Sequence, residues 1–175
     1  MKTKLCVLGV MALVIWGMKR HYADARADDL QWILRPTTVV VGVVSRASFV
    51  WQPGEGYFSR AHLFLVEKSC AGINYMVAAF GMLVLARLHR VGSGMSAVQV
   101  VGVGVLASYV AAVLVNAVRI AVALWLATHP VARSMFSAAD VHRVEGIVVY
   151  FGALVLLYEL VHRLDRRAVP IGRTP

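Results

Sequence analysis

The sequence predicts an all-α polytopic membrane protein, and two observations carry that prediction. Apolar residues make up 59% of the 175 positions, and the mean hydropathy is +0.71. Soluble domains contain roughly 45–50% apolar residues, so lipid must cover the apolar surface that a chain of this length cannot bury. The Lys and Arg residues stand mainly at the ends of long apolar runs, where they anchor helices and set their orientation. We therefore expect residues 1–175 to form a single membrane domain with about four transmembrane helices.

The net charge of +9 would suggest a nucleic-acid partner in a soluble protein. Here the basic residues follow the ends of the apolar runs, so the expected surroundings are a lipid bilayer and not nucleic acid. The sequence does not indicate an oligomeric state.

The first apolar run extends from Leu5 to Met18 and has basic residues on both sides. It is shorter than a typical span of roughly 17–25 residues, yet we interpret residues 1–22 as an N-terminal anchor span. A cleaved signal peptide is the alternative, because Ala23-Asp24-Ala25 has the form of a cleavage site. The basic cluster Lys19-Arg20-His21 directly after the run favours the uncleaved anchor.

Residues 70–162 are expected to supply the other spans as a helical core. The run from Cys70 to Leu88 would be about 29 Å long as a helix, and the last run extends from about Val144 to Val161. Between them, Met95 to Thr128 would be about 51 Å long, which exceeds a hydrocarbon core of about 30 Å. This middle segment must break, tilt or project beyond the bilayer.

Basic clusters at 87–90 and 163–167 orient these spans, since positive residues favour the cytoplasmic side. Both termini then lie inside, with residues 163–175 as a basic cytoplasmic tail. Cys70 and a loop from His129 to His142 face the outside. We therefore expect a multi-pass protein of the cell inner membrane whose site faces the periplasm.

Residues 30–69 are expected to lie at the outer interface. Leu30 to Arg46 is too interrupted by charge and proline for a span and fits an amphipathic interfacial helix. The apolar residues around Pro53-Gly54 predict a small β-hairpin, because this dipeptide favours a type II turn. Leu63 to Val66 would add a third strand.

Three side chains from separate spans reach one depth in this arrangement. Cys70 opens its span at the outer interface, and His142 stands just before the last span. Arg119 lies about 36 Å along its helix from the inner face, which is also the outer interface. A thiol, a guanidinium and an imidazole are therefore expected at one membrane face.

Each residue also has a plainer interpretation. A lone Cys is usually inert packing, an Arg near a helix end can extend to the interface, and a loop His is common. Their shared depth favours acyl transfer instead. Cys70 would be the nucleophile, His142 would accept its proton and later protonate the leaving amine, and Arg119 would stabilise developing negative charge. Asn116, one helical turn before Arg119, would support it, and Glu67 would be an orienting or solvated group near Cys70.

These residues resemble the motifs of the exosortase/archaeosortase family. Val66 to Asn74, with Cys-Ala-Gly-Ile-Asn at its end, resembles the cysteine motif, in which Gly72 is a supporting residue. Asn116-Ala117-Val118-Arg119-Ile120 is similar to the Asn-x-x-Arg-Ile motif, and His142 followed by Gly146 resembles the third motif. The resemblance covers about Phe49 to Leu160 and is closest to the exosortase K type. The chain departs from many bacterial members in its short N-terminal part and in Ala71, where Ser is commoner.

The resemblance implies a cysteine protease or transpeptidase that cleaves the C-terminal sorting tails of exported proteins. Such a tail has a short motif (Pro-Glu-Pro in the typical bacterial case), a transmembrane helix and a basic end. Cys70 would form a thioester acyl-enzyme, with Arg119 and His142 completing the catalytic site and no cofactor needed. Water or an amine would then resolve the thioester.

The alternative is a non-enzymatic membrane component of an envelope or exopolysaccharide export system, in which Cys70 is packing and Arg119 an anchor. A transporter fits less well, because no inverted repeat appears and the charges lie away from the membrane midplane. A metal hydrolase also fits poorly, because the six His are scattered without ligand spacing.

Overall fold

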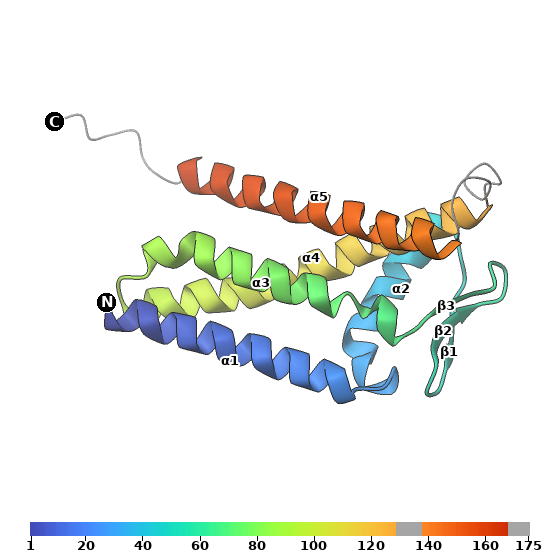
Figure 1. Ribbon diagram of the computed structural model, residues 1–175, viewed down its shortest axis with the longest axis horizontal. Coiled ribbons are helices and arrows are strands. Elements are labelled where there is room, and N and C mark those ends of the chain that lie inside the picture. Colours follow the sequence, from blue (N-terminus) through green and yellow to red (C-terminus); the bar gives the residue numbers. More distant parts are fainter. Residues whose placement is uncertain (129–137, 168–175) are drawn as a thin grey trace.

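The computed structural model describes the backbone of residues 1–128 and 138–167 and the side chains of residues 1–126 and 144–166. Four helices lie side by side along the long axis (Figure 1): α1 (Lys2–Asp24), α3 (Ile73–Arg87), α4 (Gly94–Thr128) and α5 (Ala138–Arg167). Helix α2 (Gln31–Ser45) crosses the bundle and packs on α4. The 3-10 turns are η1 (Asp28–Leu30), η2 (Lys68–Ala71) and η3 (Leu88–Arg90).

In the described part of the chain, three helical segments are long and apolar enough to cross a membrane: Lys68–Arg90, Gly94–Leu126 and Val144–Arg166. The helical membrane character that the sequence predicts is confirmed at this level. Helix α1 is continuous and packs along α3, with Val7 buried against Phe80 and Val84. It is not among the three segments, so a fourth span and its orientation remain predictions.

One expected boundary is wrong. Helix α5 begins at Ala138, so the backbone at His142 is helical and does not belong to a loop. The same helix continues through Arg163 to Arg167, so the first residues of the predicted basic tail are helical, and the cytoplasmic position of the tail stays a prediction. Hydropathy locates only the apolar part of a helix, whereas backbone hydrogen bonding continues through polar residues at either end. Helix α4 is continuous over 35 residues, which excludes a break and leaves tilt or projection.

Residues Leu30–Arg46 form the predicted helix, in which one face is buried and Pro36 lies inside. The buried residues recur at helical spacing: Ile33, Leu34, Thr37, Thr38 and Val41. Pro36 has no N–H to donate to the carbonyl oxygen of Trp32, four residues earlier. The Tyr109 hydroxyl of α4 donates to that oxygen at 2.8 Å, and its ring stacks on Trp32 with centroids 5.9 Å apart. A side chain of α4 thus replaces the missing backbone bond of α2.

The predicted hairpin and third strand form an antiparallel sheet of β1 (Val50–Gln52), β2 (Gly56–Ser59) and β3 (Phe64–Val66). The turn has the expected type II features, with Gly54 at φ 78° and the Glu55 N–H donating to the Gln52 oxygen at 3.1 Å. The Gly54 N–H also donates to Asp28 of η1 at 3.2 Å. The sheet lies at the end of the bundle where α3 begins (Figure 1).

Tyr109→Phe should leave the Trp32 oxygen without its donor while keeping the ring stack. We expect the free energy of unfolding to fall by about 1–3 kcal/mol, measured as a lower thermal midpoint in detergent. In a Pro36→Ala background the new backbone N–H can reach the same oxygen, so the loss should largely disappear. An equal loss in both backgrounds would show that the hydroxyl acts elsewhere.

The hairpin tip and the turn between η3 and α4 are separated by the Lys68–Arg90 span, so they should lie on opposite sides of the membrane. In a Cys6→Ser, Cys70→Ala background, Glu55→Cys should react in intact cells with a membrane-impermeant maleimide. Gly92→Cys should react only after the membrane is opened. Reaction of both from one side would contradict a crossing between them.

Candidate functional site

Cys70 lies in η2, the short turn that leads from β3 into α3. Its N–H donates to the Glu67 oxygen at 2.9 Å, and Gly72 then takes a left-handed conformation with φ 68° before α3 begins. Cys70 is buried, with 5% of its surface exposed, while Cys6 of α1 is exposed. The turn therefore places the thiol next to the N-terminus of a candidate span.

Asn116 of α4 holds this turn in place. Its side chain is completely buried, and its Nδ2 donates to the Cys70 carbonyl oxygen. The approach depends on Gly72, because a Cβ atom there would lie 3.1 Å from Asn116 Cγ. Glycine thus permits both the left-handed backbone and the close contact with α4.

Tyr150 of α5 connects Asn116 to Arg119. The Tyr150 hydroxyl donates to Asn116 Oδ1 at 2.8 Å and accepts from Arg119 Nη1 at 3.1 Å. The Arg119 guanidinium also lies 5.4 Å from the centre of the Tyr150 ring, within range of a cation–π contact. A continuous chain of hydrogen bonds therefore runs from the Cys70 carbonyl through Asn116 and Tyr150 to Arg119.

Glycine also makes room for Arg119 on α5. A Cβ atom at Gly146 would lie 3.4 Å from Arg119 Nε, so a larger residue would press on the guanidinium. Gly146 and Tyr150 are four residues apart and share one face of α5. This face receives Arg119 from α4.

A pocket of about 530 Å³ opens beside these residues. Arg119 lines it together with Ser69 and Gly72, whereas Cys70, which lies between those two residues in the sequence, is not among the lining residues. The other walls come from α1, α3 and α5: Tyr22, Ile73, Asn74, Gly146, Ile147, Tyr150, Phe151 and Leu154.

Glu67 accepts a hydrogen bond from Ser69, the residue that precedes Cys70. The Ser69 hydroxyl donates to Glu67 Oε1 at 2.8 Å and lies 3.9 Å from Cys70 Sγ. The carboxylate thus orients a hydroxyl that contacts the sulfur, which gives the predicted supporting residue a concrete contact.

Helix α1 closes one side of the pocket, which the sequence did not indicate. The Tyr22 hydroxyl donates to the Lys68 carbonyl oxygen at 3.4 Å, and Lys68 Nζ donates to the Ala23 oxygen at 3.1 Å. Lys19 Nζ also donates to Asn74 Oδ1 at 2.8 Å. These contacts fix the end of α1 against the start of α3.

His142, the third predicted catalytic residue, has a described backbone only. It lies on α5 one helical turn before Gly146. Its side chain is outside the described residues, so its meeting with Cys70 and Arg119 remains a prediction. Sequence reasoning missed Tyr150, because the sequence does not show which face of α5 meets Arg119.

Among the described residues, no group of three or more His, Cys, Asp or Glu side chains could hold a metal ion. No protein family model, no curated protein and no solved structure matches the chain. The function must therefore be argued from the site itself.

Gly72→Ala should destabilise the protein more than Gly54→Ala. Both introduce a Cβ atom at positive φ, at a cost of about 1–2 kcal/mol, but Gly54 has open space around it. At Gly72 the Cβ atom also presses on Asn116, so a further loss of about 1–3 kcal/mol is expected from the buried amide. Thermal unfolding in detergent measures the difference.

Gly92→Ala is the matched control, because Gly92 has open space and no positive φ. Equal losses at Gly72 and Gly54 would mean that Asn116 adapts without cost.

Proposed function

We propose that this protein is an exosortase-like cysteine protease or transpeptidase that cleaves the C-terminal tails of exported proteins at a membrane–water interface. The observation that carries the proposal is the hydrogen-bond chain that ties the backbone of Cys70 to Arg119 beside an open pocket. This chain connects the backbone that carries the thiol to the guanidinium, which supports a shared site for Cys70 and Arg119. The resemblance to the family's three motifs supplies the substrate class.

The chemistry proceeds in two stages. The Cys70 thiolate attacks the scissile carbonyl carbon, a carbon–sulfur bond forms, and negative charge develops on the carbonyl oxygen. Arg119 stabilises this oxyanion. His142, which takes the thiol proton, returns it to the amide nitrogen as the carbon–nitrogen bond breaks. The thioester is then resolved by water, which gives proteolysis, or by an amine, which gives transpeptidation.

The pocket suits a substrate that arrives within the membrane. Ile147 and Phe151 line it, yet they are 61% and 70% exposed, so an apolar surface continues from the pocket along α5. An apolar tail helix could lie on this surface and place its adjoining peptide bond near Cys70. Substrate binding would then depend on lipid-facing residues of α5 as well as on the polar site.

The burial of Cys70 favours a second function. A thiol that is 5% exposed is typical of packing, as expected for a non-enzymatic component of an export system. Only the enzymatic function requires the Cys70 sulfur to act as a nucleophile. Cys70→Ser keeps size and burial but removes the strong nucleophile, so an assembly role should survive it and thiol catalysis should not.

The decisive experiment is processing of a reporter protein that carries a Pro-Glu-Pro motif, an apolar helix and a basic end. Cells with the wild-type protein should shorten the reporter, whereas Cys70→Ala, Arg119→Ala and His142→Ala should each reduce cleavage by at least about a hundredfold. Immunoblotting of membranes with matched protein levels measures it.

The matched controls Cys6→Ala, Arg20→Ala and His62→Ala remove the same chemical groups at other positions. These variants should cleave the reporter as the wild type does. An independent readout is an adduct on Cys70 that neutral hydroxylamine releases, since a thioester is expected whatever the tail motif. Normal cleavage by the Cys70→Ala variant would contradict the thiol mechanism and favour the assembly role.

A further inference from the structure

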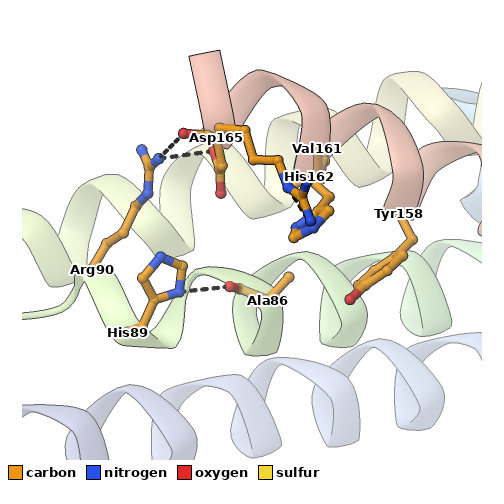
Figure 2. Close-up of a pocket in the computed structure, with 8 residues that line it drawn as sticks. Ala86, His89, Arg90, Tyr158, Val161, His162 and Asp165 are labelled. Atoms are coloured by element: carbon orange, nitrogen blue, oxygen red, sulfur yellow. Dashed lines mark hydrogen bonds and ion pairs between the residues drawn. The ribbon is translucent and has the colours of Figure 1, made fainter. Parts of the chain in front are cut away.

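A second pocket lies at the end of the bundle opposite the candidate site. It has a volume of about 240 Å³ and opens between the end of α3 with η3 and the last turns of α5. Figure 2 shows polar side chains from the two helices around it: His89, Arg90, Tyr158, His162 and Asp165. Arg166 also lines the pocket. The proposed function uses none of them.

The pocket has a surplus of positive charge. Asp165 is its carboxylate, and it lies 3.2 Å from Arg90 Nη2 and 3.7 Å from Arg87 Nε. Arg90 Nη2 also donates to the Asp165 carbonyl oxygen at 3.4 Å. One negative charge therefore faces two guanidinium groups, of which Arg90 lines the pocket and Arg87 does not. Arg166 is the second guanidinium of the lining, so the lining carries one positive charge in excess, which one anionic phosphodiester would balance.

The basic groups are held in place before any ligand binds. Arg166 Nε donates to His162 Nε2 at 3.0 Å, and the His162 ring stacks on Tyr158 with centroids 6.0 Å apart and an angle of 7°. His89 Nδ1 lies 2.9 Å from the Ala86 carbonyl oxygen, which can only accept, so this nitrogen carries the proton. Such preorganisation lowers the entropy lost when an anion binds.

The position of the pocket indicates which anion it meets. The candidate spans Lys68–Arg90 and Val144–Arg166 both end here, at the level where lipid headgroups begin. Helix α1 begins at the same end of the bundle with Lys2 and Lys4 (Figure 1).

We propose that this pocket binds the phosphate group of an anionic phospholipid. The guanidinium groups of Arg90 and Arg166 bind the phosphate oxygens, because planar guanidinium groups suit phosphate geometry. Basic pockets between membrane helices commonly receive lipid headgroups in this way. The lipid thereby joins the ends of two spans that Asp165 also connects through its ion pairs.

Native mass spectrometry of the full-length protein tests the proposal by counting retained lipid after transfer from phosphatidylglycerol vesicles into detergent. The wild type should retain phosphatidylglycerol, and Arg90→Gln and Arg166→Gln should each retain about tenfold less. Arg163→Gln is the matched control, because Arg163 lies on the same helix, is 74% exposed, pairs with Glu159 and does not line the pocket. It should bind like the wild type.

Further arms separate the sources of phosphate and exclude misfolding. Phosphatidylcholine has the same phosphodiester without net charge, so it should be retained poorly, and millimolar inorganic phosphate should not displace the lipid. Arg166→Gln leaves the Asp165 ion pairs intact, and its thermal midpoint in neutral lipid should match that of Arg163→Gln. Equal retention by all variants, equal retention of phosphatidylcholine, or displacement by inorganic phosphate alone would overturn the lipid assignment.

Discussion

The buried amide of Asn116 is the contact on which the arrangement of the site depends. An amide side chain offers a donor and an acceptor side by side, so one residue on α4 can satisfy a carbonyl of the η2 turn and a hydroxyl of α5 together. In a membrane, leaving a polar group without a hydrogen-bond partner costs roughly several kcal/mol, because no water molecule replaces the lost bond. The η2 turn, α4 and α5 are therefore held in one register, because breaking these hydrogen bonds would leave buried polar groups without partners.

The polar groups of helix α2 also have hydrogen-bond partners, but these arise in another way. Its proline removes one backbone donor, and a hydroxyl from α4 takes that place. Thr37 and Thr38 bond back to the carbonyl oxygens of Ile33 and Leu34 at 2.8 and 3.0 Å, so their buried hydroxyls need no outside partner. Two polar side chains of the mainly apolar helix α4 thus form hydrogen bonds with three neighbours: Tyr109 bonds to α2, and Asn116 bonds to the η2 turn and to α5.

Local sequence predicted the elements well where one strong rule applied. Pro53-Gly54 specified the turn because both residues restrict the backbone, and the long apolar runs specified helices because length and hydropathy suffice. The depth of Arg119 in the membrane stays a prediction from the constant rise per residue. The link through Tyr150 could not be predicted, because it depends on the rotation of α5 about its own axis. An apolar helix that is hydrophobic on all sides gives no sequence signal for that rotation.

The burial of Cys70 was also beyond sequence reasoning. It depends on Gly72, whose positive φ turns the chain towards α4, and on α1, which packs its end against the start of α3. Neither contact follows from hydropathy. Hydropathy also placed the start of α5 too late. Asp140, His142 and Arg143 are polar, yet their backbone belongs to the helix.

The length of α4 ties the depth of the site to the thickness of the bilayer. A helix of 35 residues is about 52 Å long, and fitting it into about 30 Å of hydrocarbon would need a tilt of about 55°, beyond the range of 0–40° seen for spans. If α4 crosses such a bilayer, part of it must therefore lie outside the hydrocarbon. If Arg119 lies at the outer interface as the sequence predicts, a thicker membrane would cover more of the helix and would bring Arg119 closer to the hydrocarbon. Membrane thickness would then determine how far the guanidinium is from water.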